Sequence, residues 1–313
     1  MKMYSLSLLL VFSMSFNTTT ADTQEAKSYN QNPVNGNLLV GRNDPSKYMP
    51  AQYGHGGAGT VRYMELTPRE KFTTQFLFIH RGVFDPKSGL GEHVHRWMEE
   101  MYFVLDGNTA QFTVNGHTAE LPGPCMVLCP MGASHGIYNP SDNTVQFMNV
   151  GVAYRDRQYD AVDLGKKDDL ADTEIESPPT FRWSVLDKRL LRPTTNFLGG
   201  KGIVYKRAVW TTESFRTNWG YVNHYLLTPG SSIGYHRHDD FDEVYYIFSG
   251  KGRMTIDDVT IEVRAGDAGT VLIGGRHGLY NNSDEDIEVI SIGVPLEKKL
   301  PHGVPLGDDL TKR

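Results

Sequence analysis

Cysteine is scarce in this chain of 313 residues, which contains only Cys125 and Cys129. If both lie in one extended strand, four steps of about 3.3 Å place their Cα atoms about 13 Å apart. A disulfide needs Cα atoms within about 7 Å of each other. We therefore predict two free, buried thiols. A cysteine pair can also bind a metal ion, but the sequence holds no second pair.

Basic residues are outnumbered by acidic residues. The sequence has 31 Lys and Arg against 37 Asp and Glu, which gives a net charge of −6 at pH 7, and its basic residues form no clustered stripe. A protein that binds nucleic-acid backbones needs a basic face. The charge pattern therefore argues against a nucleic-acid partner, and the small-molecule substrate that we expect instead is implied by the motifs described below. The sequence leaves both a monomer and a homodimer open.

The N-terminus has the features of an export signal. Lys2 provides a positive start, Tyr4 to Phe16 is mostly apolar, and Thr19 and Ala21 are small residues at the spacing that signal peptidase prefers. The apolar stretch is too short to span a bilayer, and no cysteine follows it to carry a lipid anchor. We expect residues 1–21 to be a signal peptide cleaved near Ala21, with a periplasmic or extracellular product. The alternative is a disordered or buried N-terminal strand.

Glycine and proline divide the rest of the chain into short segments. The sequence has 32 Gly and 16 Pro, and runs of Val, Ile, Tyr, Phe and Thr lie between them. Many short strands at regular spacing are typical of a sandwich or closed barrel. We predict strands that include Gln75–Ile79, Met101–Leu105, Thr109–Val114, Cys125–Leu128, Tyr221–Leu227, Val244–Phe248, Gly252–Ile256 and Ala268–Leu272.

The chain repeats itself. Four segments recur 143 residues later: Gly56–Val61 as Gly199–Val204, His93–His95 as His236–His238, Glu100 as Glu243, and Gly107 as Gly250. His135–Asn139 recurs 142 residues later as His277–Asn281, which one deleted loop residue explains. A period this long indicates a duplicated domain rather than a solenoid repeat. We predict an extension over residues 22–55 along a barrel edge, domains over 56–155 and 191–300, a linker over 156–190, and a loose tail over 301–313.

Each copy carries a set of potential metal ligands. His93 and His95 are two residues apart, so on a strand both side chains point to the same face. Glu100 and His135 follow, and the second copy repeats the set as His236, His238, Glu243 and His277. Three imidazoles and one carboxylate suit a divalent transition metal and leave coordination positions open for substrate. The alternative, six buried histidines that only bond one another, would be costly to desolvate.

These motifs resemble those of the bicupins. The cupin pattern is H-x-H, three or four residues, E, six residues and G, followed by P-x-G, two residues, H, three residues and N. The first copy matches from His93 to Gly107 and from Pro130 to Asn139; the second matches from His236 to Gly250 and from Gly274 to Asn281. Lys87 and Leu272 depart from the family's Gly and Pro, but neither is a ligand position. The resemblance implies an all-β chain of two tandem cupin jelly-roll barrels.

Residues beside the ligands are further candidates. Glu99 and Asp242 each precede a ligand glutamate, so on a strand they should point out of the barrel. Tyr138 and Tyr280 each follow a motif histidine by three residues, which makes them candidate catalytic proton donors, although a packing role in a duplicated turn is the alternative. Trp97, Tyr102 and Phe103 are candidates to line or support the first site, and we expect Asn139 and Asn281 to hold turns through their side chains.

The resemblance leaves the reaction open. It favours a dioxygenase of the quercetinase type acting on an enol, phenolic or related substrate. A metal-dependent isomerase or lyase of a sugar or keto compound is an alternative, as is an enzyme that converts oxalate, although that family's Arg before the first histidine is replaced by Leu90 and Ile233. A non-catalytic binding or storage cupin is the fourth possibility. We expect two metal ions per chain, with iron or manganese favoured and copper, nickel or zinc possible.

Overall fold

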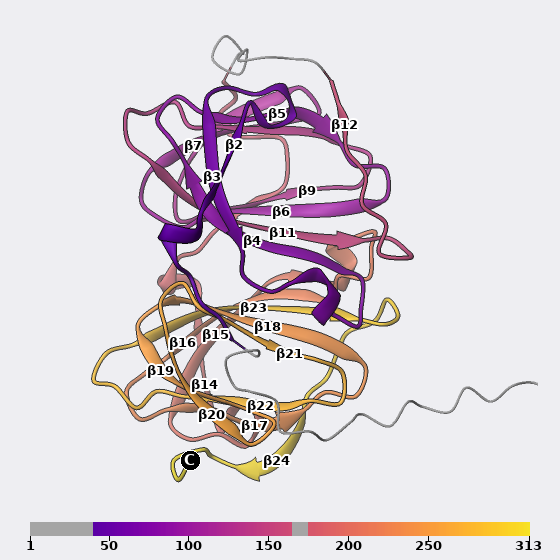
Figure 1. Cartoon of the computed structure of the whole chain (residues 1–313). Helices are drawn as coiled ribbons and strands as arrows, with labels where there is room; N and C mark the ends of the chain where they lie inside the picture. The colour runs from indigo at the N-terminus through magenta and orange to yellow at the C-terminus, as the bar shows by residue number, and fades with distance from the viewer. Residues whose placement is uncertain (1–39, 165–174) are drawn as a thin grey trace, which may run out of the picture. The chain divides into compact units, whose positions relative to one another are not determined.

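The computed structural model describes residues 40–164 and 175–313, and the chain from Asn35 to Arg313 forms one compact unit. The described part consists of strands and short 3-10 helices (Figure 1). None of its helices is long and apolar enough to cross a membrane. The predicted signal peptide lies outside the described residues. The helices are η2 (Pro45–Lys47), η3 (Gly54–Gly56), η4 (Arg69–Lys71), η6 (Lys188–Leu190), η7 (Phe197–Gly199) and η8 (Thr212–Ser214).

The strands form two jelly-roll barrels, which confirms the predicted all-β fold. The first barrel contains β2 (Met49–Gln52), β3 (Thr60–Glu65), β4 (Phe76–Phe84), β5 (Gly89–Val94), β6 (Met98–Val104), β7 (Thr109–Val114), β8 (His117–Pro122), β9 (Cys125–Cys129), β10 (Ser134–Tyr138), β11 (Val145–Ala153) and β12 (Val162–Asp163). The second contains β14 (Arg192–Thr195), β15 (Ile203–Thr211), β16 (Tyr221–Leu227), β17 (Ser232–Arg237), β18 (Phe241–Ser249), β19 (Lys251–Ile256), β20 (Val259–Arg264), β21 (Ala268–Val271), β22 (Arg276–Tyr280), β23 (Ile287–Pro295) and β24 (Val304–Asp308).

The sheet topology repeats the sequence duplication. Two further strands, β1 (Val40–Gly41) and β13 (Trp183–Val185), complete the sheets. The larger sheets have the orders β13-β9-β6-β11-β4-β3-β2 and β1-β21-β18-β23-β16-β15-β14, and the smaller ones β12-β5-β10-β7-β8 and β20-β19-β22-β17-β24. Inside each barrel, side chains of the two sheets meet in a hydrophobic core. Both cysteines are free and buried, as predicted.

Short strands tie each barrel to the other. The strand β1 (Val40–Gly41) pairs with β21 of the second barrel, and β13 (Trp183–Val185) pairs with β9 of the first barrel. Within the predicted N-terminal extension, β2 is the last strand in its sheet. The prediction of a loose tail was wrong: residues 304–308 form β24 and pair with β17, because the unpaired edge of β17 offers its backbone groups to this segment.

Side chains on β6 and β18 point alternately into their own barrel and toward the other barrel. Phe103 of β6 and Val244 and Tyr246 of β18 belong to one buried cluster that contains residues of both barrels, including Met126 and Trp210. The interleaved residues on the same strands face their own barrel. Each of these two strands therefore contributes to two cores at once.

The predicted outward direction of Glu99 and Asp242 is explained by contacts across the interface. The Glu99 carboxylate accepts hydrogen bonds from the backbone of Arg216 and Thr217 and from the Thr217 hydroxyl, at 2.7–3.0 Å. Asp242 accepts from the backbone and hydroxyl groups of Thr73 and Thr74 at the same distances. Residues 73–74 and 216–217 are counterparts in the duplication, so the two bonding arrangements are reciprocal.

Asn139 and Asn281 hold turns, as predicted. Each side-chain amide nitrogen donates to at least two backbone carbonyl groups. Each side-chain oxygen accepts from the backbone N–H of the serine two residues later. These contacts fix the loop that follows the strand carrying the last motif histidine of each barrel.

Replacing Asp242 by alanine should destabilise the interface. Asp242→Ala leaves the buried donors of Thr73 and Thr74 without an acceptor, which we expect to lower the free energy of unfolding by about 3 kcal/mol. Urea denaturation followed by far-UV circular dichroism measures this change. Asp142→Ala is the matched control, since the Asp142 side chain is 92% exposed and forms a surface ion pair with Lys87, so little change is expected. Equal stability of both variants would contradict the assigned role of Asp242.

Candidate metal centres

The first candidate site lies inside the first barrel, where two sheets bring four side chains together. His93 lies on β5 and His135 on β10, directly opposite each other across the strand pair. His95 follows β5 immediately, and Glu100 extends from β6 of the other sheet. All four side chains are at most 4% exposed. The structure thus gathers the four residues that the H-x-H and P-x-G motifs indicated.

The second barrel repeats the arrangement with His236 on β17, His277 on β22 and Glu243 on β18. His236 and His277 are again direct cross-strand partners, and His238 follows β17. In each barrel the ligand atoms lie within 4.8 Å of one another. The chain therefore has two metal-binding sites of three histidines and one glutamate each.

Distances in both sets fit metal ligands. Nε2 of His135 lies 2.9 Å and Nε2 of His95 lies 3.3 Å from Oε2 of Glu100. Nε2 of His277 lies 3.0 Å and Nε2 of His238 lies 3.1 Å from Oε2 of Glu243. One oxygen thus faces several ring nitrogens in each barrel, which is the arrangement expected around a shared cation.

The tautomers of two histidines are set by backbone carbonyl groups. Nδ1 of His93 bonds to the carbonyl of Gly91, and Nδ1 of His236 to that of Gly234, both at 2.8 Å. Because Nδ1 donates, Nε2 carries a lone pair directed into the site. Nε2 of His93 has no hydrogen-bond partner although it is buried. A metal ion would satisfy this nitrogen, so the residues fit a divalent transition metal.

The electrostatics favour the ligand forms of Glu100, Glu243, His93 and His236, whereas for His95 burial is outweighed by the Glu100 carboxylate, which raises its pKa. Burial opposes ionisation of Glu100 and Glu243, but the surrounding histidines hold the pKa of each carboxyl well below its usual range. Burial lowers the pKa of His93 to about 2 and that of His236 well below its usual value. Ionised carboxylates and neutral imidazoles are the protonation states that bind metal ions.

Several side chains that support the ligands carry no sequence motif. The hydroxyl of Tyr221 donates to Oε1 of Glu243 at 2.6 Å, and that of Ser291 donates to the same atom at 2.5 Å. The ring of Tyr245 lies 4.8 Å from that of His277. Only Tyr245 could have been found from the sequence, because it follows Glu243 by two residues on one strand.

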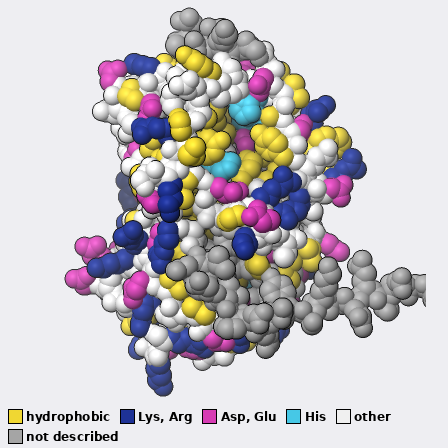
Figure 2. Space-filling model, viewed as in Figure 1, with side chains coloured by type: hydrophobic (Ala, Val, Ile, Leu, Met, Phe, Trp, Pro, Cys, Tyr) yellow, Lys and Arg dark blue, Asp and Glu magenta, His cyan; other side chains and the backbone are white. Residues whose placement is uncertain are grey.

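The first site has different neighbours. The ring of His55 stacks on that of His93 at 3.8 Å, and its Nδ1 bonds to Asp163 at 2.6 Å. His80 stacks on Phe78 at 4.4 Å, and burial lowers the pKa of His80 to about 4. Figure 2 shows histidine side chains of this half of the chain among hydrophobic side chains. Residues outside the motifs therefore distinguish the two sites.

Tyr138 and Tyr280 are not placed at the metal ligands. They lie on β10 and β22, three positions after His135 and His277, where strand alternation turns their side chains to the opposite face. Tyr280 packs beneath the guanidinium of Arg253, at 5.3 Å. Their role as proton donors stays a prediction that this geometry does not favour.

The other aromatic candidates take three different positions. Tyr102 faces the site, with its ring 6.2 Å from that of His135. Phe103 is buried in the interface between the barrels. Trp97 packs against Arg155, whose guanidinium lies 4.8 Å from the ring centroid. Only Tyr102 therefore supports the first site as expected.

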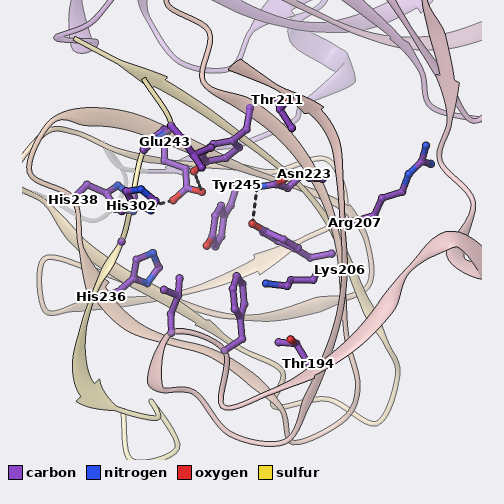
Figure 3. A pocket seen from close by; sticks show the side chains of 18 of the residues that line it. Thr194, Lys206, Arg207, Thr211, Asn223, His236, His238, Glu243, Tyr245 and His302 are labelled. Atoms are coloured by element: carbon purple, nitrogen blue, oxygen red, sulfur yellow. Dashed lines mark hydrogen bonds and ion pairs between the residues drawn. The ribbon is translucent and has the colours of Figure 1, made fainter. Parts of the chain in front are cut away.

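A cavity of about 570 Å³ opens onto the second site (Figure 3). His236, His238 and Glu243 lie at one end of it, and aromatic side chains line much of the wall. Residues of β14 and β15 line the part away from these ligands, and His302, from the segment that leads into β24, lies beside His238 (Figure 3). The lining residues include Arg192, Phe197, Lys206, Tyr225, Tyr245 and His302. This volume is in the range of small-molecule sites.

Comparison with known proteins identifies the family. The cupin domain matches residues 80–151 and 223–293. The chain is also 30% identical over 98 residues to the oxalate-binding protein of Thermotoga maritima, a match that covers 31% of this chain and 81% of that protein. The chain belongs to the cupin family. It is a bicupin, because both barrels carry the domain.

Solved structures share the bicupin fold. Oxalate decarboxylase from Bacillus subtilis superposes with a TM-score of 0.58 at 18% identity, covering 86% of this chain and 78% of that one. Salicylate 1,2-dioxygenase from Pseudaminobacter salicylatoxidans also gives 0.58, at 14% identity, covering 79% of this chain and 81% of that one. Mn(II) centres are described for the oxalate decarboxylase. At these identities the likeness concerns the fold alone.

Metal content should follow the two glutamates separately. We expect two equivalents of metal in the wild-type bicupin and about one in Glu100→Gln and in Glu243→Gln, because each loses its only anionic ligand. Inductively coupled plasma mass spectrometry of the purified proteins measures this. His117→Ala is the control, since His117 lies on the surface against Glu176, and it should keep two equivalents. Two full equivalents in both glutamate variants would contradict the assigned ligands.

Gly303 should be essential for the geometry of the second site. A methyl group at this position would lie 2.6 Å from Cδ2 of His236, so the imidazole would have to move. Because ligands must be held within about 0.5 Å of productive geometry, we expect Gly303→Ala to weaken binding of one of the two metal ions about tenfold. Titration of apoprotein with Mn²⁺ measures this. Gly107→Ala, where the added methyl meets open space, is the control. Wild-type affinity at both sites of Gly303→Ala would refute the prediction.

Proposed function

We propose that this bicupin is an exported, metal-dependent dioxygenase that acts on an enol, a phenol or a related ring compound. The observation that carries the proposal is the intact three-histidine, one-glutamate set at the end of a cavity walled by aromatic side chains. Export follows from the predicted signal peptide, and N-terminal sequencing of protein from its source cells tests it. A mature chain that starts at Met1 would contradict export.

The proposed reaction needs no reductant besides the organic substrate. A redox-active metal ion bound by the second set would supply the one-electron steps through which a closed-shell enol reacts with dioxygen. A carbon–carbon bond of the substrate breaks, and both atoms of dioxygen enter the products. The four electrons that reduce dioxygen come from the substrate, so the balance is complete.

The residues of the chain position the reactants. Tyr221 and Ser291 both donate to Oε1 of Glu243, which fixes the carboxylate with Oε2 toward the histidines. The ring of Phe241 stacks on that of His238 at 3.9 Å and restrains this imidazole. Tyr245 and Tyr225 provide apolar faces along the cavity, against which a flat ring can pack while water is displaced.

Conversion of oxalate is the second candidate, supported by the identity with the Thermotoga maritima oxalate-binding protein. The position three residues before the first motif histidine argues against it. Ile233 there is fully buried in the core of the second barrel, and Leu90 packs against the core of the first. Neither provides the guanidinium that would hold a small dianion beside the ligands.

Oxygen uptake distinguishes these candidates. Iron-loaded and manganese-loaded protein is mixed with quercetin, salicylate or oxalate in an oxygen-electrode chamber, and products are analysed after labelling with ¹⁸O₂. We expect uptake with a ring compound, two labelled oxygen atoms in the products, and loss of at least about 100-fold in rate in Glu243→Gln. Formate from oxalate without net oxygen uptake would instead support the oxalate reading. Fully metal-loaded protein that consumes no oxygen with either ring compound would contradict the proposal.

A further inference from the structure

Two cations lie side by side in the wall of the second cavity. Arg192 on β14 and Lys206 on β15 are direct cross-strand partners, and both line the cavity. Like charges directly opposite in a sheet destabilise it. Their presence in the wall of a cavity that reaches a metal-binding set therefore calls for an explanation outside the sheet itself.

Neither cation has a carboxylate partner among the described residues. Nη1 of Arg192 donates to the backbone carbonyl of Leu191 at 3.1 Å, and the Lys206 ammonium lies 4.5 Å from the ring centroid of Phe197. The only acidic side chain that lines the described cavity wall is Glu243, which belongs to the metal set. Figure 3 shows Lys206 directed into the cavity, whereas Arg207 beside it turns away to Ser184 and Val185. Lys206 and Arg192 thus leave positive charge available to a ligand.

The first barrel provides an internal comparison. At the corresponding strand pair, Met49 on β2 lies opposite Tyr63 on β3. Tyr63 packs its ring 4.8 Å from that of His80. The same strand pair therefore forms with an uncharged pair at this position in the first barrel, so the fold does not require the two cations.

The cations and the metal ligands are separated by two rings. Lys206 lies directly opposite Tyr225 across the strands β15 and β16. The ring of Tyr225 is 6.3 Å from that of Tyr245, which in turn is 4.8 Å from that of His277. A ligand that touches both ends must span these two aromatic side chains. A two-carbon diacid is too short, whereas a ring compound with an acidic group at its far end fits.

We propose that the second cavity binds a ring-bearing organic acid, with its anionic group between Arg192 and Lys206 and its other end at the three-histidine, one-glutamate set. The inference rests on the proposed function and names its substrate class as an aromatic or enolic carboxylate. The corresponding positions of the first barrel, Met49 and Tyr63, carry no charge.

Binding to redox-inactive protein tests the inference apart from catalysis. Zinc-loaded protein is titrated by isothermal calorimetry with 4-hydroxycinnamate and with its uncharged methyl ester. We expect the wild-type protein to prefer the acid, and Lys206→Met to lose about tenfold or more in affinity for the acid but not for the ester. Lys206→Arg should retain the preference, and Arg192→Met should weaken it. Lys251→Met, outside the cavity, is the control with no expected change.

Three outcomes would overturn the inference. An acid preference that survives in Lys206→Met would mean that the carboxylate sits on the metal ion instead. An equal loss for acid and ester would assign Lys206 to general packing, and no binding of either probe by the wild type at millimolar concentration would exclude this class of ligand. Charge-dependent binding without any oxygen uptake would leave the anion subsite in place and refute only the dioxygenase.

Discussion

The alternation of side chains on one strand connects the metal site of each barrel to the other barrel. Glu99 and Glu100 are neighbours on β6, and Asp242 and Glu243 are neighbours on β18, so the pleat sends the two carboxylates of each pair in opposite directions. One faces the histidines, and the other accepts hydrogen bonds from the opposite barrel. A change in the position of either strand would disturb both contacts at once. The interface therefore acts as the rigid support that metal ligands need.

Complete burial of the two ligand sets is expected only if each set binds a cation. Six imidazoles and two carboxylates lie inside the barrels at no more than 4% exposure. Uncompensated burial of so many polar atoms would cost several kcal/mol for each charged group. A cation shared by each set would compensate the carboxylate and the nitrogen lone pairs together. Because such an ion binds the folded state, metal supply and stability of the fold should be coupled.

The sequence was most informative where function depends on local spacing. The offset of 143 residues predicted two barrels, and the distances within H-x-H and the later motifs predicted which residues meet, because strand alternation is regular. Strands such as 109–114 and 221–227 were predicted with the bounds that the structure has. The tail over 301–313 was not, since pairing of β24 with β17 depends on an exposed edge that only the folded barrel creates.

The tyrosines show most clearly which contacts cannot be predicted from spacing in the sequence. Tyr138 and Tyr280 were chosen because they follow motif histidines, but an odd spacing on a strand directs a side chain away from its neighbour's face. Tyr221, which bonds Glu243, lies 22 residues from it and reaches it only because β16 and β18 both pair with β23. Partners that are set by strand order rather than by spacing carry no motif.

The duplicated fold keeps the same metal-ligand set in both barrels while other residues of the two barrels differ in charge. The strand order and the ligand sets are the same in both barrels. The strand pairs β2 with β3 and β14 with β15 lie apart from the ligands, at the far edge of the larger sheets. There an uncharged pair in one copy corresponds to two cations in the other. Residues at such edges, rather than the metal ligands, are therefore the positions at which the two barrels can acquire different substrates.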